Sequence, residues 1–429
     1  MDGVLFKIGN KKMLKNGINK GKNLYKNSNL SLVNKIIFIN FLIESLILIT
    51  EDRFLIIAFQ TIINIFLILL YHLNISKIYN IKYLSFLTYF LILYNTILII
   101  FSSDLILSFN YSSKFLLPIF YLIIGITIIN NLLDIQQIIK TLWIYLAYFT
   151  IYIIIVNIFA IGEEMYVGGL KTGYFSLNGL YIPCFSLIVL LFNYNYIKDK
   201  KTKYLTLIFG IATLLIFVVL LKRTMLLLLG ISLIIYLIKY AKLSRIIPYI
   251  IVVFIIFSSI PFFQENLTKS LESRNSRFNK EYSVTGEGRF TENIIMYNIM
   301  IKEPIKIILG SGEVFNDRKY ISKYYELERE AHNSYIRIFW NGGIVGIILF
   351  ILFYFFQVNI LLLSYRKIKD IALKKLMFFI IFLILLRFIN DFSSGITYVS
   401  FNAFCYLLIG GVIKLSIINF NKLNLKKQP

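Results

Sequence analysis

Long apolar runs separated by short polar segments dominate the pattern of this chain. Most runs approach or exceed about 18 residues, and a bilayer core needs roughly 20 apolar residues for each helix that crosses it. The runs lack the alternation of apolar and polar positions that is typical of a membrane β-barrel. The pattern therefore predicts an all-α, polytopic membrane protein with about 12 transmembrane helices. The predicted spans are 32–50, 54–73, 84–101, 115–129, 141–161, 179–192, 204–221, 224–237, 246–263, 336–356, 376–389 and 399–418.

One long polar stretch interrupts the spans and forms a predicted loop at 265–335, between spans 9 and 10. Apolar positions at helical spacing over 289–302 predict a helix in this loop, which Pro304 closes because proline cannot continue the backbone hydrogen bonding. Gly310-Ser311-Gly312 then predicts a tight turn. The predicted organisation is a basic segment 1–31, spans 1–9 within 32–264, the loop 265–335, spans 10–12 within 336–418, and a tail 419–429.

Basic residues fall mainly on one side of this predicted topology. With the N-terminus in the cytoplasm, the inner segments hold 25 Lys and Arg residues against 4 Asp and Glu residues. The loop 265–335 holds 11 residues of each sign, so it carries no net charge. This positive-inside asymmetry predicts that both termini are cytoplasmic and that the loop is extracytoplasmic. The net charge of +23 thus follows from topology, and we expect no nucleic-acid partner.

The composition argues against several other classes of protein. The chain is 58% hydrophobic and 16% charged, whereas a soluble domain is about 25% charged. Cys184 and Cys405 both lie in predicted spans and form neither a disulfide framework nor a metal-ligand spacing. The sequence has no phosphate-binding loop, dinucleotide fingerprint or zinc spacing. We therefore expect no cofactor and no bound metal.

His332 is the strongest candidate for chemistry. It lies in Ala331-His332-Asn333-Ser334-Tyr335, at the mouth of span 336–356, and the chain has one other histidine, His72. Histidine titrates near neutral pH and can accept and return a proton. Asn333 and Ser334 are predicted to cap the following helix, whose N-terminus favours the neutral imidazole. The structural alternative is a loop histidine with one backbone hydrogen bond.

Three basic residues on the predicted outer side are candidates for binding an anion. Lys222 and Arg223 stand between two spans, where short outer loops otherwise avoid positive charge. Arg289 follows glycines that permit a sharp turn and opens the predicted loop helix. A guanidinium presents a fixed fork that suits phosphate oxygens. The structural alternatives are snorkelling of the pair to head groups and a surface ion pair of Arg289 with Glu287 or Glu292.

Arg387 and Asp391 lie at the outer end of span 376–389. Charges at this depth face a bundle interior or a cavity, so both are candidate substrate-binding residues, together with Lys222 and Asn333. A structural ion pair is an equal alternative for Arg387 and Asp391.

The order and spacing of these features resemble the O-antigen ligase and polymerase superfamily of bacterial polysaccharide assembly. The resemblance covers Gly288-Arg289, Pro304, Gly310-Ser311-Gly312 and Ala331–Tyr335, followed by Asn341-Gly342-Gly343-Ile344-Val345-Gly346-Ile347. Lys222-Arg223-Thr224 looks like the Ser-Arg motif of that superfamily, with lysine in place of serine.

The resemblance implies glycosyl transfer on the outer face of the bacterial cytoplasmic membrane. The implied donor is a glycan on polyprenyl diphosphate, and the acceptor is another lipid-linked glycan for a polymerase, or a lipid or protein anchor for a ligase. Membrane lipid and a chain-length regulator protein are the further partners implied. Arg223 and Arg289 would bind the diphosphate, and His332 would act as the base of a metal-independent, inverting transfer.

A flippase or transporter of lipid-linked sugars is the alternative from another class, because it also needs about twelve spans and cations in a cavity. Transporters often show pseudo-symmetric halves, and none are evident in this sequence. The polymerase is favoured over the ligase only as the commoner role in polysaccharide assembly.

Overall fold

The computed structural model describes residues 28–45, 60, 62–67, 82–102, 104–161, 171–173, 175, 179–220, 223–240, 288–311, 333–393 and 399–425. Within these residues every regular element is a helix, as the apolar pattern predicts. Predicted span 246–263 lies outside the described residues, and so does most of span 54–73.

Each of the other predicted spans overlaps a described helix. These helices are α2 (Ser28–Ser45), α4 (Lys82–Ile100), α5 (Leu105–Ile128), α6 (Leu132–Ile158), α7 (Tyr181–Asn193), α8 (Lys200–Leu220), α9 (Arg223–Tyr240), α15 (Ser334–Lys367), α16 (Ile371–Asn390) and α17 (Val399–Leu425). Among them, α5, α6 and α15 extend well beyond the predicted bounds. The shorter elements are η3 (Tyr194–Tyr196), α12 (Gly288–Met300), α13 (Pro304–Leu309) and η4 (Asp391–Ser393). Within the described part of the chain, four helices are long and apolar enough to cross a membrane, namely α6, α8, α15 and the 399–419 part of α17.

Polar side chains fix where several helices begin. The Asn131 side chain accepts hydrogen bonds at the start of α6, and Asp134 completes a reciprocal capping box. The Asp370 side chain caps α16 by accepting hydrogen bonds from the backbone N–H groups of Ala372 and Leu373. Before α8, the Asp199 carboxylate accepts hydrogen bonds from the backbone and hydroxyl of Thr202, at 2.8 and 2.6 Å. These bonds favour the charged form and lower the pKa of Asp199.

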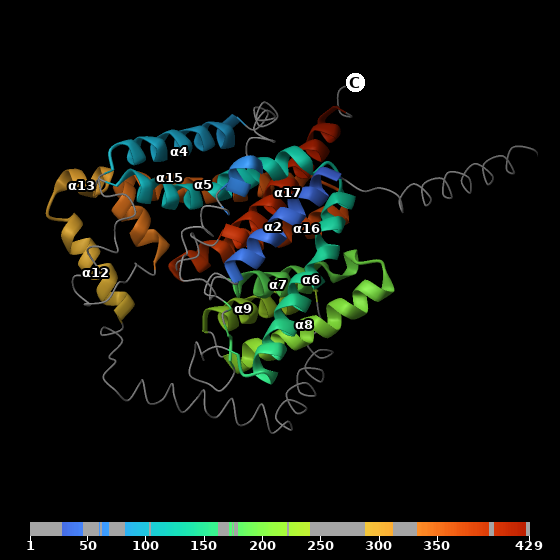
Figure 1. Ribbon diagram of the computed structural model, residues 1–429. Helices are drawn as coiled ribbons and strands as arrows, with labels where there is room; N and C mark the ends of the chain where they lie inside the picture. The colour runs from blue at the N-terminus through green and yellow to red at the C-terminus, as the bar shows by residue number, and fades with distance from the viewer. Residues whose placement is uncertain are drawn as a thin grey trace, which may run out of the picture.

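α17 forms the centre of the bundle and packs most extensively against α5 (Figure 1). Their close approach depends on small residues, because a Cβ on Gly410 would lie only 2.1 Å from the carbonyl oxygen of Leu122. Such small-residue crossings let helix backbones pack tightly where burial from water supplies little driving force between helices. α2, α15 and α16 also pack against α17, and α6 to α9 form a neighbouring group.

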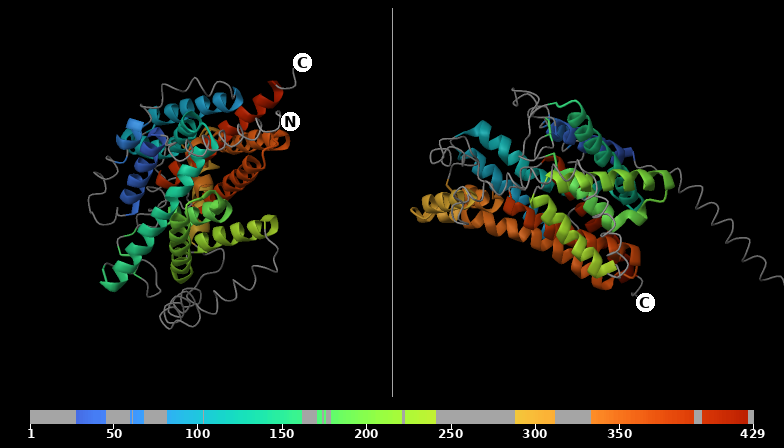
Figure 2. Two further views of the ribbon diagram at one scale, coloured as in Figure 1. Left: turned by 90° about the vertical axis from the view of Figure 1, so that its right-hand side faces the viewer. Right: turned by 90° about the horizontal axis from the view of Figure 1, so that it is seen from below.

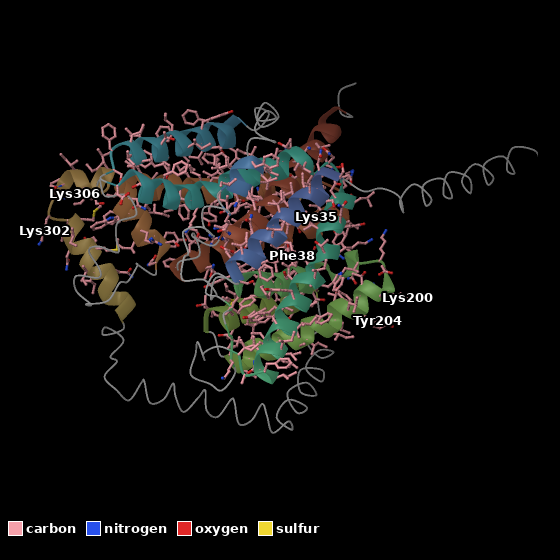
Figure 3. All side chains as sticks on the ribbon, viewed as in Figure 1. Lys35, Phe38, Lys200, Tyr204, Lys302 and Lys306 are labelled. Carbon is pink, nitrogen blue, oxygen red and sulfur yellow. The ribbon has the colours of Figure 1, made fainter. Side chains whose placement is uncertain are left out.

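α12 and α13 lie at one end of the bundle, and α17 ends at the opposite end (Figures 1 and 2). Lys302 and Lys306 stand at the first of these ends, whereas Lys35 and Lys200 lie toward the other (Figure 3). α2 and α16 run toward the α12–α13 end, and α15 and α17 start there. This arrangement agrees with the predicted alternation of spans, while the cytoplasmic location of the termini stays a prediction.

Candidate functional site

α15 is broken close to the end at which it begins. Gly343 adopts φ 60° and ψ −154°, so residues 334–342 form a short helix with its own direction before the long part of α15 continues. The short helix folds back over the long part of α15. The ring centroids of Tyr335 and Phe350, fifteen residues apart in the chain, lie only 5.8 Å from each other. A straight helix would separate those residues by roughly 22 Å at 1.5 Å per residue.

α13 packs directly against this break. A Cβ on Gly343 would lie 2.3 Å from the carbonyl oxygen of Ile308, and one on Gly310 would lie 2.3 Å from that of Asn341. The backbone N–H of Ser311 donates to the Trp340 carbonyl at 2.8 Å. Gly310 and Gly343 therefore have the same structural role. The lack of a side chain at both positions lets the loop backbone contact the broken helix α15.

Replacing Gly343 by alanine should destabilise the protein by about 1–3 kcal/mol, because the backbone conformation there is open essentially to glycine alone and the new Cβ would meet Ile308. The free energy of unfolding of purified protein in mixed micelles would measure this effect. Gly230→Ala in α9 is the matched control. Its Cβ would meet nothing within 4 Å, so it should be neutral or mildly stabilising. Equal behaviour of the two variants would contradict the prediction.

The start of α15 is held by its own cap and by the end of α16. The Asn333 side chain accepts a hydrogen bond from the backbone N–H of Tyr335 at 2.9 Å, which confirms the predicted capping role. The Tyr335 hydroxyl donates to the Phe388 carbonyl at 2.7 Å. The backbone next to His332 is thereby tied to α16.

Beside this junction, Arg387 and Asp391 form an ion pair inside the protein. Their side chains are 1% and 0% exposed, and Arg387 also donates from Nε to Asn402 at 3.0 Å. The Tyr354 hydroxyl donates to the second oxygen of Asp391 at 2.6 Å, and the guanidinium lies over the ring of Phe401. Hydrogen bonds of this kind are what a desolvated ion pair requires.

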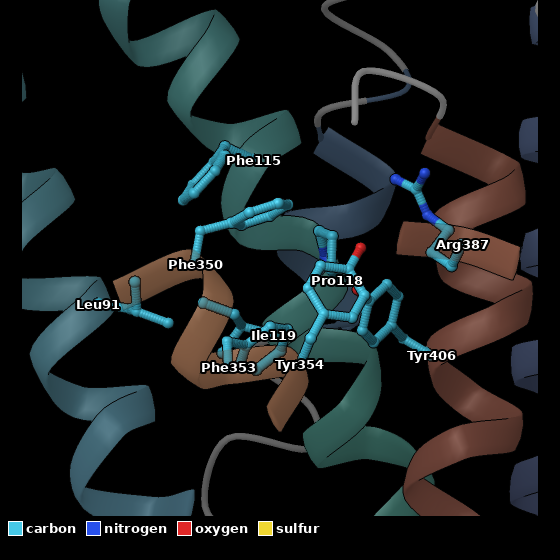
Figure 4. Close-up of a pocket in the computed structure, with 9 residues that line it drawn as sticks. All are labelled: Leu91, Phe115, Pro118, Ile119, Phe350, Phe353, Tyr354, Arg387 and Tyr406. Carbon is cyan, nitrogen blue, oxygen red and sulfur yellow. The ribbon is translucent and has the colours of Figure 1, made fainter. Parts of the chain in front are cut away.

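A small cavity adjoins the ion pair (Figure 4). Arg387, Tyr354 and Tyr406 contribute polar groups to its wall, and the rest of the wall is apolar side chains from α4, α5 and α15. Because the guanidinium of Arg387 is engaged with Asp391, this lining suits an apolar group better than a diphosphate.

A chain of contacts links the ion pair to the start of α9. The Phe401 ring beneath Arg387 lies 4.2 Å from the ring of Phe185 in α7. The neighbouring Cys184 donates from its thiol to the Met225 carbonyl in the first turn of α9. Arg223, the first residue of α9, thus begins a helix at the end of the bundle where α15 and α17 also begin.

The predicted site residues divide into three groups. Asn333, Arg387 and Asp391 are described in full. Arg223 is the first residue of α9 and Arg289 the second residue of α12, but the side chains of both lie outside the described residues. Lys222 and His332 lie outside them altogether. Convergence of the two arginines and His332 therefore stays a prediction, and so does substrate binding by Lys222, Asn333, Arg387 and Asp391.

Among the described residues, two buried charged residues inside predicted spans were not anticipated from the sequence. Arg337, in the short helix of α15, is 2% exposed. Glu44 of α2 accepts hydrogen bonds from the backbone of Val399 and Ser400 and from the Ser400 hydroxyl, and so caps α17. Each is a charged residue inside a predicted apolar span, which was the available signal, because such residues are rarely left unpaired.

The fold is that of a helical membrane protein in which two short helices, α12 and α13, pack against the broken helix α15. Residues 205–351 match the family described as O-antigen ligase, whose members are membrane enzymes that transfer glycans. The resemblance seen in the motifs is therefore confirmed over about a third of the chain. A comparison with curated proteins finds no match.

Proposed function

We propose that the protein polymerises polyprenyl-diphosphate-linked oligosaccharide units on the outer face of the bacterial cytoplasmic membrane. One observation carries this proposal. The family match over 205–351 contains Arg223, Arg289 and His332 together, the three side chains on which a charge-compensated transfer would depend.

The arrangement of the matched elements supports the proposal. α12, whose first turn contains Arg289, packs against the part of α15 that starts just after His332. Arg223 opens α9, whose first turn contacts α7 through Met225. All of these helix starts belong to the end of the bundle that carries α12 and α13, where a lipid-linked substrate of the outer leaflet would arrive.

The proposed reaction is a single displacement. Neutral His332 accepts the proton of an acceptor hydroxyl while that oxygen attacks the anomeric carbon of the donor glycan. The bond from the anomeric carbon to the diphosphate breaks, and polyprenyl diphosphate leaves with the bonding electrons. Arg223 and Arg289 bind the diphosphate and offset its growing charge, as fixed cations in a water-poor site do. One displacement inverts the configuration at the anomeric carbon.

Replacing Arg223 or Arg289 by alanine should lower the rate of transfer by about 10²–10³-fold, because each removes a cation from the leaving diphosphate. Lysine at either position should restore part of the rate, since it keeps the charge without the fork. Purified protein, a synthetic polyprenyl-diphosphate glycan and a chelator present throughout give the measurement. Arg366→Ala, an exposed arginine in the last turn of α15, should retain the parental rate. A fully active Arg223→Ala or Arg289→Ala variant would remove that arginine from the mechanism.

A ligase is the second candidate, favoured because the matched family is described as O-antigen ligase. A polymerase joins two lipid-linked glycans and yields a ladder of products on the polyprenyl carrier. A ligase moves the glycan to a different lipid or to a protein. Supplying both kinds of acceptor in one assay, and separating the products by mobility, distinguishes the two.

A flippase of lipid-linked sugars would behave differently from both enzymes. It needs a sealed bilayer with two compartments, whereas an enzyme forms new glycosidic bonds in detergent. Transport into vesicles without any new bond would overturn the proposed function.

A further inference from the structure

α12, α13 and the turn between them carry a row of exposed apolar side chains. Ile294 and Tyr297 lie three positions apart in α12, Ile301 lies in the turn, and the others belong to α13. Ile305 is 73% exposed, far more than a side chain packed within a bundle. The outer stripe consists of Ile294, Tyr297, Ile301, Ile305, Ile308 and Leu309.

An adjoining side of α12 is anchored in the protein. Met296 and Met300 are fully buried and pack with Phe339 and Trp340 of the short helix of α15. The Tyr297 ring, at the edge of the outer stripe, stacks on Phe339 with 6.5 Å between ring centroids, so this packing fixes which side chains of α12 are left exposed.

The outer stripe continues into the surface of a membrane-crossing helix. The Ile308 carbonyl lies against Gly343, and the next residue, Ile344, begins a row of exposed apolar side chains on α15. This row is Ile344, Ile348, Ile351 and Phe355. α15 is long and apolar enough to cross a membrane, so its exposed row faces lipid, and the outer stripe meets that row at the break.

The polar residues near the outer stripe suit the boundary of a bilayer. Lys302 and Lys306 stand at the turn between α12 and α13 (Figure 3), and Lys306 pairs with Glu303 at 2.6 Å. Lysines that flank an apolar helical face, with a tyrosine such as Tyr297 in that face, are typical of helices that lie in the head-group region.

We propose that α12 and α13 dock on the outer surface of the phospholipid bilayer, with the outer stripe at the boundary between head groups and acyl chains. The occupant of this face is lipid. The loop would then be fixed at a defined depth beside α15, whichever reaction the protein catalyses.

Quenching of a fluorophore on single introduced cysteines tests this proposal in full-length protein in nanodiscs of phosphatidylcholine and phosphatidylglycerol. Cys184 and Cys405 are both buried, so labelling is directed to the new thiol. Ile301→Cys and Ile305→Cys report on the outer stripe. Ile348→Cys is the control for lipid, and Lys201→Cys, exposed in the first turn of α8, is the control for water.

Brominated phospholipid should quench both stripe labels to at least about half the extent seen at Ile348→Cys, and aqueous iodide should quench them far less than Lys201→Cys. Strong iodide quenching with no lipid quenching would overturn the proposal. Protection from both quenchers would overturn it too, since another part of the chain would then cover the outer stripe. Disulfide cross-linking between copies through Ile305→Cys, in place of lipid quenching, would assign the face to a second copy.

Discussion

Replacing His332 by alanine should lower the rate of glycan transfer by about 10²–10⁴-fold, which is the usual contribution of a general base. The acceptor hydroxyl would keep its proton until late in the attack, so the barrier rises while donor binding changes little. The assay with purified protein and a chelator measures the effect as a fall in kcat. Donor binding, followed by displacement of a labelled polyprenyl diphosphate, should stay within a few-fold of the parent.

His72→Ala is the matched control, because His72 is the other histidine of the chain and lies in a predicted span. It should retain the parental rate. The parent should also lose activity as the pH falls from about 8 to about 5.5, since a base works only while it is unprotonated and free imidazole titrates in this range. A His332→Ala variant that keeps the rate and this pH profile would exclude His332 as the base.

Replacing Asp391 by alanine should lower the free energy of unfolding by about 3–5 kcal/mol, because it leaves the guanidinium of Arg387 buried without its carboxylate. Unfolding of purified protein in mixed micelles gives the measurement. Removing both charges with Arg387→Met and Asp391→Leu should recover most of the loss, since no buried charge is then left alone.

Glu303→Ala is the control for this second prediction. It breaks the exposed pair with Lys306, and exposed pairs contribute no more than about 1 kcal/mol. If Asp391→Ala costs no more than Glu303→Ala, the buried pair does not stabilise the fold. If Asp391→Ala unfolds normally but loses transfer, the substrate-binding role predicted for the pair gains support.

The sequence predicted local features of the fold well, because each is encoded by nearby residues. Apolar runs located the described helices, and Asn333 was recognised as the cap of α15. Residues 289–302 were predicted as a helix, and α12 covers most of that range. Pro304 was expected to close this helix, but α12 already ends at Met300 and Pro304 instead begins α13. Proline fits the first turn of a helix as readily as it ends one.

Features that depend on distant contacts were not predicted. Paired glycines mark possible turns, but the break of α15 at Gly342-Gly343 was not predicted, because it goes with contacts from distant residues. The Ile308 carbonyl lies against Gly343, and the Tyr94 hydroxyl of α4 donates to the Gly342 carbonyl at 2.8 Å. The bond from Glu44 to Ser400 spans 356 positions. Such pairings follow from how helices pack, which hydropathy does not encode.

In the candidate site too, local features were predicted from the sequence and distances between distant residues were not. Residue type and position identified His332 and the two arginines, because cations and a base at the mouth of spans are chemically unusual there. Their mutual distances depend on the loop and on the entry to α9, whose side chains lie outside the described residues. Arg337 was missed although a charged residue within an otherwise apolar span is itself a signal.

The break at Gly343 sets the smallest portion of this protein that could be transplanted into a homologue. Exchanging the 265–335 loop alone would separate α13 from the backbone of residues 340–343, against which it packs. A functional graft would have to run from α12 through the bend into the long arm of α15, and the host would need a hydroxyl where Tyr94 stands. Chimeras that combine substrate preferences should therefore succeed when their junction falls beyond residue 343 and fail when it falls before.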